Sequence, residues 1–118
     1  MSQERDPRVY LDDMVTAATK AIEFVDGLSF DEFVSDDRTT FAVIRAFEIL
    51  GEAAKQVPSP IRKQLPRVPW QDMAGMRDKL IHAYHGVDLH VVWRAIGEDL
   101  PMVVTEVRRL LDELDDAG

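Results

Sequence analysis

A long apolar stripe at helical spacing, near the end of the chain, limits the choice of fold more than any other feature. Asp88 is expected to cap a helix, and after it apolar side chains recur in steps of three and four residues as far as Leu114. This spacing places them on one face of a helix. Pro101 lies within the stripe without shifting its register, so we expect one long helix that is kinked there, or broken by a turn or less. The stripe comprises Leu89, Val92, Trp93, Ile96, Leu100, Val103, Val104, Val107, Leu110, Leu111 and Leu114.

Three earlier segments show the same periodicity, and their ends carry residues typical of helix boundaries. Asp6 followed by Pro7 predicts a helix start, because a carboxylate caps the first N–H groups and proline fits the first turn. Gly27 is typical of a residue just past a helix end. The predicted helices run from Asp6-Pro7 to Asp26-Gly27, from Asp36-Asp37 to Pro58 and from Pro69-Trp70 to Gly86.

Short helical turns are expected between these helices. Ser29-Phe30-Asp31-Glu32 fits a capping box, and Ser59-Pro60 can cap a single turn that reaches Leu65. No stretch alternates with a period of two residues, and no repeat or low-complexity segment is present. The sequence therefore predicts an all-α fold, an up-down bundle of four main helices joined by short links. We expect one domain over residues 1–118, with its core in residues 8–113 and a frayed tail over residues 115–118.

Composition excludes several classes of site and location. The chain has no cysteine, so neither a disulfide framework nor a thiolate metal site can form. No apolar run approaches the ~18 residues of a membrane span. The first residues, Met1-Ser2-Gln3-Glu4-Arg5-Asp6, lack a signal-peptide pattern, so we expect a cytoplasmic protein that does not contact a membrane.

Charge is unevenly distributed along the chain. The net charge of −8 argues against a general nucleic-acid binder, because phosphate contacts need a positive surface. Residues 1–56 hold 6 basic and 12 acidic side chains, and residues 95–118 hold 2 and 7. Residues 57–94 hold 6 basic and 3 acidic side chains, together with all three histidines. This cationic segment is compatible with a local anion site on an acidic protein that itself meets a basic partner.

Arg77 interrupts an apolar stripe within the cationic segment. A structural helix would carry leucine at this position, and a buried guanidinium costs several kcal/mol unless it is paired or reaches water. His82 follows Asp78 by one helical turn, so the carboxylate can hold and polarise the imidazole. The alternative is an arginine that extends out of the core and an exposed histidine. The apolar members of this stripe are Trp70, Met73, Ala74, Leu80, Ile81 and Tyr84.

Arg45, Glu48 and Glu52 form a polar line on the preceding long helix. The favoured interpretation is a solvated, salt-bridged surface. The alternative is that the line reaches a cleft and pairs with Arg77. Gly51 lies beside this line and costs roughly 1 kcal/mol relative to alanine in a helix, which favours close packing of another helix at this point.

His82, His85 and His90 are the remaining candidates for a metal site. Their spacing of three and then five residues, across Gly86, does not match one helical face, and no carboxylate cluster completes a ligand set. The six glycines are scattered, so they form no loop that cradles a phosphate. We therefore expect neither a metal nor a cofactor.

The pattern Arg77-x4-His82-x-Tyr84 resembles the R-x4-H-x-Y signature of HepT-type HEPN-domain proteins. R-x4-H alone is weakly specific, but further segments resemble that family in the same order, over residues 8 to 113. Asp78 departs from the pattern, because many members have asparagine there, and this changes how His82 would be oriented and titrate. The matching segments are Ile49 to Lys55, Pro69-Trp70, Met76 to Tyr84, Val87-Asp88, Val92-Trp93 and Asp99-Leu100-Pro101.

This resemblance implies a HEPN-like bundle that acts as the toxin of a toxin–antitoxin pair. It implies a homodimer whose two motif helices meet in a composite cleft. It also implies a metal-independent endoribonuclease that cuts RNA but not DNA, because the ribose 2′-hydroxyl attacks the adjacent phosphorus. His82 would then be the general base or acid. Arg77 would stabilise charge on the phosphoryl oxygens, and Asp78 would orient one of these two residues.

The resemblance further implies a protein partner that silences the toxin. This partner is a minimal nucleotidyltransferase antitoxin, which would transfer AMP to Tyr84 and place a bulky anion where the RNA phosphate binds. A non-catalytic alternative is a dimeric adaptor that docks a nucleotidyltransferase or binds nucleotide, which the acidic charge favours. Loss of RNA cleavage in a His82→Ala variant would separate the two.

Overall fold

The computed structural model describes residues 6–82 and 88–117, with the side chains of residues 6–80 and 88–116. These residues form helices and connecting turns, and no strand occurs among them. The predicted all-α fold is therefore confirmed. The helices are α1 (Pro7–Phe24), α2 (Phe30–Ser35), α3 (Asp37–Gln56), α4 (Ser59–Arg62), α5 (Trp70–His82), α6 (Leu89–Glu98) and α7 (Leu100–Ala117).

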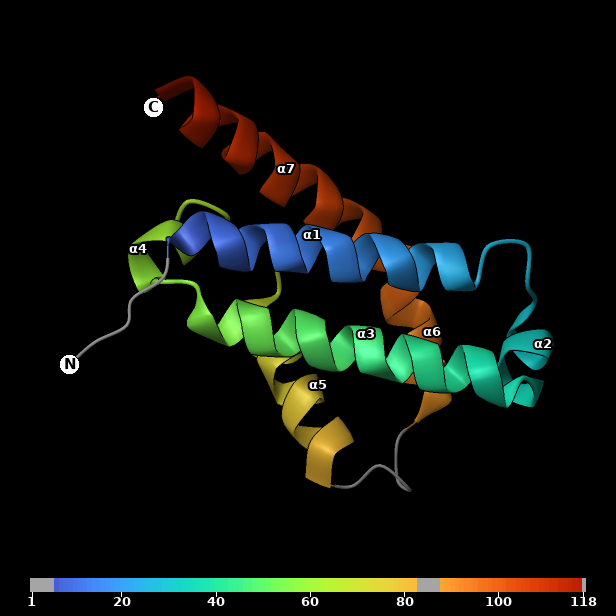
Figure 1. Ribbon diagram of the computed structural model, residues 1–118. Coiled ribbons are helices and arrows are strands. Elements are labelled where there is room, and N and C mark those ends of the chain that lie inside the picture. The colour runs from blue at the N-terminus through green and yellow to red at the C-terminus, as the bar shows by residue number, and fades with distance from the viewer. Residues whose placement is uncertain (1–5, 83–87, 118) are drawn as a thin grey trace.

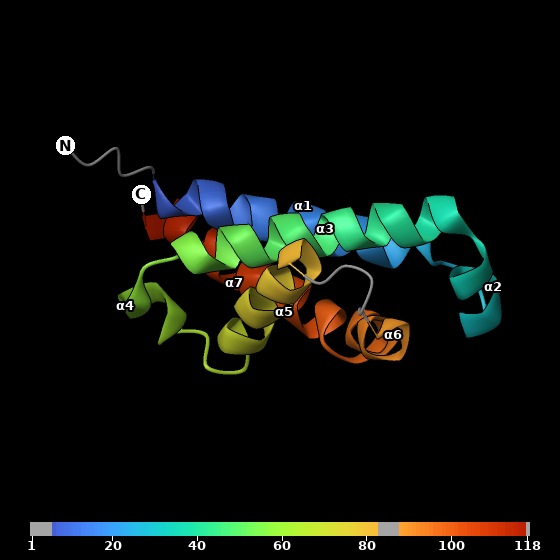
Figure 2. The same ribbon diagram turned by 90° about the horizontal axis from the view of Figure 1, so that it is seen from below.

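The two long helices α1 and α3 lie side by side and run in opposite directions (Figure 1). α7 packs against α1, and α5 packs against α3. Seen from below, the short helices α4 and α2 lie at opposite ends of the molecule, while α5 crosses α3 between them (Figure 2). α3 is therefore the helix that joins the α1–α7 half of the bundle to the motif helix α5.

The predicted helix starts agree with the observed caps. The carboxylates of Asp6, Asp36 and Asp88 each accept a hydrogen bond from the backbone N–H two residues later, at 2.9 to 3.1 Å. Ser29 and Glu32 form the predicted capping box, with hydrogen bonds of 3.1 and 2.9 Å. Each cap satisfies N–H groups that the first turn of a helix leaves without a partner.

Gly27 also has the predicted role. Its φ of 79° lies in the left-handed region, which glycine adopts without the steric penalty that a Cβ atom brings. The residue lies just past the end of α1, where such a conformation turns the chain out of the helix. α1 therefore begins and ends where the sequence predicts.

The last predicted helix is broken rather than kinked. α6 ends at Glu98 and α7 begins at Leu100. The interruption at Asp99 is therefore shorter than one turn, which agrees with the predicted alternative of a break of a turn or less. Pro101 occupies the first turn of α7, where its missing N–H removes no helical hydrogen bond. α7 continues to Ala117, past Asp115, where the sequence suggested a frayed tail.

The predicted cap at Ser59 is wrong. Pro58 holds the N-cap position of α4, and no side chain makes a capping hydrogen bond there. Pro58 has an extended backbone with φ −61° and ψ 147°, and its ring holds φ near this value as the chain enters the turn. Backbone turns then continue as far as the amide of Leu65, which donates a 3.0 Å hydrogen bond to the carbonyl of Arg62.

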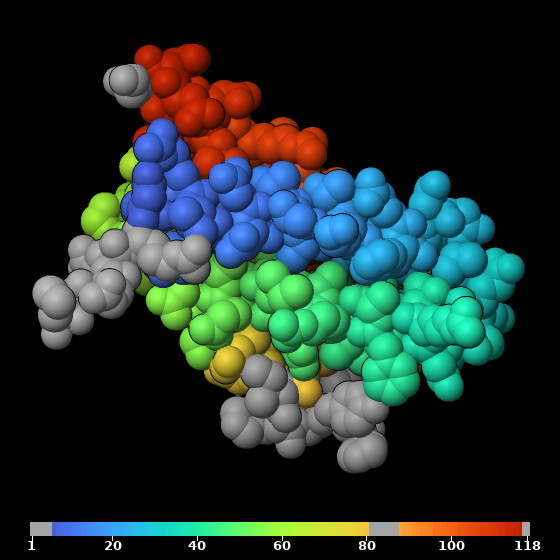
Figure 3. All heavy atoms as spheres, viewed as in Figure 1, coloured from blue at the N-terminus to red at the C-terminus, as the bar shows by residue number. Residues whose placement is uncertain are grey.

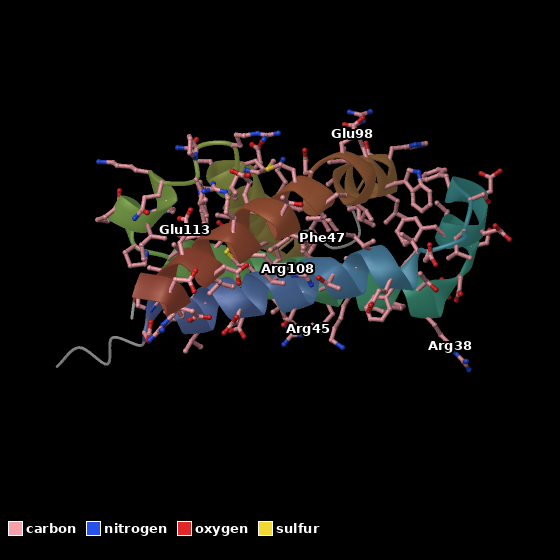
Figure 4. The ribbon with its side chains drawn as sticks, turned by 90° about the horizontal axis from the view of Figure 1, so that it is seen from above. Arg38, Arg45, Phe47, Glu98, Arg108 and Glu113 are labelled. Carbon is pink, nitrogen blue, oxygen red and sulfur yellow. The ribbon has the colours of Figure 1, made fainter. Side chains whose placement is uncertain are left out.

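The hydrophobic core is one cluster of buried side chains from α1, α3, α5, α6 and α7, with Phe33 of α2. Leu11, Met14, Val43 and Val103 are fully buried, and each lies in a segment whose periodicity predicts a helix with one apolar face. Viewed from above, Phe47 of α3 points into the bundle (Figure 4). Burying such side chains stabilises the fold by about 1.5–3 kcal/mol each.

No helix among the described residues is long and apolar enough to cross a membrane.

Candidate functional site

Arg77 lies at the point where α5 crosses α3. A Cβ atom added to Gly51 of α3 would overlap the Cβ of Arg77 and come within 2.7 Å of the Met73 carbonyl oxygen. Only glycine permits so close an approach. The prediction that Gly51 serves close helix packing is therefore confirmed, and the residue packed against it is Arg77 itself.

The guanidinium of Arg77 is paired within the chain. Its Nη2 atom lies 3.1 Å from the Glu52 Oε2 atom on α3, and its Nη1 atom donates a 3.0 Å hydrogen bond to the Asp78 Oδ1 atom. The side chain is 24% exposed. These two ion pairs explain how an arginine is tolerated in an apolar stripe. A second subunit is therefore not required to explain the position of Arg77.

Asp78 belongs to the same network. Its Oδ1 atom also lies 3.3 Å from the Lys55 Nζ atom. The hydrogen bond from Arg77 and then that from Lys55 lower the pKa of the Asp78 carboxyl below its ordinary value of 3.8. Lys55, Asp78, Arg77 and Glu52 thus form a chain of alternating charges across the α3–α5 crossing. Asp78 contacts Arg77 directly, which supports its predicted orienting role toward that residue.

The polar line on α3 is salt-bridged, as the favoured interpretation expects, but its members take different partners. Arg45 and Glu48 pair with each other at 3.3 Å, and Arg45 extends outward from the bundle (Figure 4). Glu52, one turn further along, pairs instead with Arg77. The alternative pairing of Glu52 with Arg77 is therefore confirmed, while the Glu52 side chain itself stays on the solvated face of α3, 50% exposed. The physical reason is that Gly51 lets α5 approach within reach of the next residue on α3.

A cavity of about 500 Å³ lies along the outer face of α3 and reaches Arg77. Figure 3 shows this side of the molecule, where α1 and α3 lie next to each other and α5 follows below them. Carboxylates outnumber arginines in the lining, so the cavity is not strongly cationic. The lining residues are Tyr10 and Asp13 of α1, Arg45, Glu48, Ile49, Glu52, Ala53 and Gln56 of α3, and Arg77 of α5.

The remaining predicted site residues lie at the end of the motif helix or beyond it. His82 is the last residue of α5, but its side chain lies outside the described residues. Tyr84 and His85 also lie outside them, as does Gly86, the predicted helix stop. The structure therefore brings Arg77, Asp78 and Glu52 together and places the His82 backbone on the same helix as Arg77.

Lys55 had no role assigned from the sequence. Its position three residues after Glu52 was a usable signal, because residues at this spacing share a helix face. The missing information was the crossing partner, since the pairing with Asp78 depends on where α5 crosses α3. Gly51 marked that place in the sequence without identifying the residue that packs against it.

Comparisons with known proteins match nearly the whole chain. A family model described as Ribonuclease HepT-like matches residues 14–110. A protein of Thermococcus cleftensis named "Probable ribonuclease HepT" is 44% identical over 107 residues, which cover 91% of this chain and 97% of that protein. A Caldanaerobacter subterraneus protein named as a "Putative RNase" is 40% identical over 109 residues, which cover 92% of this chain and 97% of that protein. No solved structure gives a significant match.

Proposed function

This chain belongs to the HepT-like ribonuclease family, and on that premise we propose that it is a metal-independent endoribonuclease. The observation that carries the proposal is the placement of Arg77. Its guanidinium is held by carboxylates from two directions and remains partly exposed, five residues before His82 on the same helix. Phosphodiester cleavage requires an oriented cation and a group that transfers a proton, and Arg77 and His82 are residues of these two types.

In the proposed reaction the ribose 2′-oxygen forms a bond to the adjacent phosphorus, and the bond from phosphorus to the 5′-oxygen breaks. His82 accepts the 2′-hydroxyl proton or supplies the proton that the leaving 5′-oxygen needs. The products are a 2′,3′-cyclic phosphate and a 5′-hydroxyl. DNA is not a substrate because it has no 2′-hydroxyl.

Arg77 stabilises the negative charge that develops on the phosphoryl oxygens. Each terminal nitrogen of a guanidinium carries two N–H groups, so one carboxylate contact at each nitrogen leaves a second N–H there for the phosphate. Asp78 orients the guanidinium through its 3.0 Å hydrogen bond. Lys55 neutralises part of the Asp78 charge. The positive potential around Arg77 is therefore higher than it would be if Asp78 and Glu52 acted on Arg77 without Lys55.

The proposed biological role is that of a toxin in a toxin–antitoxin pair. We expect a homodimer that joins two motif helices, so that both copies of Arg77 and His82 line one cleft. The proposed antitoxin is a minimal nucleotidyltransferase that transfers AMP to Tyr84. The added nucleotide would bring negative charge next to Arg77 and compete with the RNA phosphate.

The second candidate function is a non-catalytic dimeric adaptor that docks a nucleotidyltransferase or binds nucleotide. The observation in its favour is electrostatic: the four-residue chain at the crossing is neutral overall, and the protein carries a net charge of −8. An adaptor of this kind would not cut RNA, whereas the endoribonuclease must.

Cleavage of a single-stranded RNA in the presence of a chelator distinguishes the endoribonuclease from the non-catalytic adaptor. We expect the wild-type protein to cut, and the Arg77→Ala and His82→Ala variants to lose cutting by at least about 100-fold, the scale set by removal of one charge-stabilising donor. Arg77→Ala keeps the Cβ atom that packs against Gly51, so its fold should survive. Arg45→Ala is the matched control, because it removes an arginine that does not contact Asp78. Equal cutting by all four proteins would place any nuclease site elsewhere.

A further inference from the structure

Glu52 contacts Arg77 from the helix opposite the motif. Gly51 and Glu52 are consecutive residues of α3, and they contact the two ends of the Arg77 side chain. Gly51 accommodates the Cβ atom of Arg77, and Glu52 binds its Nη2 atom at 3.1 Å. A long, flexible side chain that is held at both ends can adopt few conformations.

We propose that Glu52 is a positioning residue for RNA cleavage and acts by holding the guanidinium of Arg77 toward the scissile phosphate. This inference rests on the proposed endoribonuclease function and adds a residue outside the Arg77–His82 segment to it. Asp78 is the neighbour of Arg77 in sequence and moves with it on α5. Glu52 belongs to another helix, so its contact fixes the guanidinium relative to the rest of the bundle.

The exposure of Glu52 to solvent argues against a purely structural role. Its side chain is 50% exposed, and ion pairs at such exposure contribute little to stability because water competes with both partners. Stabilisation of a transition state is more demanding, because a donor displaced by about 1 Å loses most of its effect. Loss of the Glu52 contact should therefore affect the chemical step more than the fold.

The charge of Glu52 gives a signature that separates positioning from simple structural support. A carboxylate next to Arg77 weakens the attraction for an RNA phosphate. Its removal should therefore leave KM unchanged or lower it, while kcat falls because Arg77 is no longer oriented. Damage to the fold would instead reduce the active fraction and lower the melting temperature. A fall in kcat without a rise in KM or a loss of melting temperature is the expected combination.

The test is steady-state cleavage of a single-stranded RNA by wild type, Glu52→Ala, Glu52→Gln and Glu48→Ala. We expect Glu52→Ala to lower kcat by about 10- to 100-fold, the scale of a misplaced catalytic group. Glu52→Gln keeps an oxygen that accepts from Arg77 and should recover most of that loss. Glu48→Ala is the matched control. It removes the same charge from the same face of α3, but Glu48 pairs with Arg45, so kcat should stay within about twofold of wild type.

A second measurement follows Arg77 directly by NMR. Rotation of its guanidinium about the bond between Nε and Cζ should be slow in wild type and Glu48→Ala, intermediate in Glu52→Gln and fast in Glu52→Ala. A wild-type kcat in Glu52→Ala, a kcat above wild type, or equally slow rotation in all variants would overturn the inference and leave the proposed function intact. Absence of cleavage by the wild type would overturn both.

Discussion

The Cβ atom of Arg77 packs directly against Gly51, so the residue proposed to bind the RNA phosphate is also the contact point of two helices. This relationship links the fold to the site. The distance between α3 and α5 is set by a glycine, and that distance brings Glu52 within 3.1 Å of the guanidinium. A change at Gly51 should therefore affect stability and activity together.

Gly51→Ala tests this link. The added methyl group would meet the Arg77 Cβ atom and the Met73 carbonyl oxygen, neither of which can move without shifting α5. We expect a net loss of about 1–3 kcal/mol in the free energy of unfolding, because overpacking outweighs the roughly 1 kcal/mol by which alanine favours a helix. Urea denaturation measures the change.

Gly75→Ala is the matched control for that substitution. Gly75 also lies inside a helix, but a Cβ atom built there meets no atom within 4 Å. The helix preference of alanine should then act alone and stabilise the protein by about 0.5–1 kcal/mol. Equal effects of the two substitutions would show that the α3–α5 crossing tolerates a wider separation than this account requires.

The pKa of the Asp78 carboxyl tests the charge network. It lies below 3.8, first because of the hydrogen bond from Arg77 and second because of that from Lys55. We expect Arg77→Ala to raise this pKa toward its ordinary value by more than Lys55→Ala does. Titration of the side-chain carboxyl carbon by NMR measures it. A pKa that is unchanged in both variants would contradict the network.

The same shift predicts a pH dependence of stability. A carboxyl whose pKa is lower in the folded protein than in the unfolded chain stabilises the fold above the unfolded value. That contribution is lost as the pH falls through the folded pKa. Asp78→Asn should therefore cost stability at neutral pH and cost none once the pH is well below 3.8. Thermal unfolding at neutral and acidic pH compares the two proteins. A loss that persists in acid would mean that the asparagine acts through its shape and not its charge.

Dimerisation through the motif helix stays a prediction. Ion pairs within one chain already account for Arg77, so the prediction rests on the composite cleft that the proposed function requires. Sedimentation at micromolar concentration should give a particle of about twice 13.4 kDa. A strict monomer that still cuts RNA would show that one copy supplies the whole site.

AMP transfer to Tyr84 is the prediction that concerns regulation. Co-expression with the cognate nucleotidyltransferase should add one or more AMP units, each of roughly 329 Da, to wild type and none to Tyr84→Phe. Tyr84→Phe should still cut RNA and should resist the partner. Intact-mass spectrometry reads out the modification. Silencing of an unmodified wild-type protein would indicate steric masking by the partner instead.

Helix positions could be predicted from the sequence because their signals are local. The caps at Asp6, Asp36 and Asp88 and the capping box at Ser29 depend on residues within one turn, and all four are confirmed. Where prediction failed, a nonlocal or backbone effect decided the outcome. The Ser59 cap is absent because Pro58 takes the N-cap position.

The site could be predicted only along its own helix. Arg77 was identified because it interrupts an apolar stripe, and Asp78 because it lies one helical turn before His82. The polar line on α3 gave Glu52 as an alternative partner of Arg77. Which partner Arg77 takes depends on the α3–α5 crossing, which neither helix encodes alone. Lys55 was missed for the same reason, since its contact with Asp78 spans 23 positions of the chain.

The most direct test of the central claim uses an RNA oligonucleotide with one preferred cleavage position, incubated with the protein and a chelator. A second oligonucleotide is identical except for a 2′-O-methyl group at that position. We predict that the first is cut to give a 2′,3′-cyclic phosphate or its hydrolysis product, and that the second is not cut there, because its 2′-oxygen cannot attack. Cleavage of the methylated oligonucleotide at the same position, or no cleavage of either, would contradict the account.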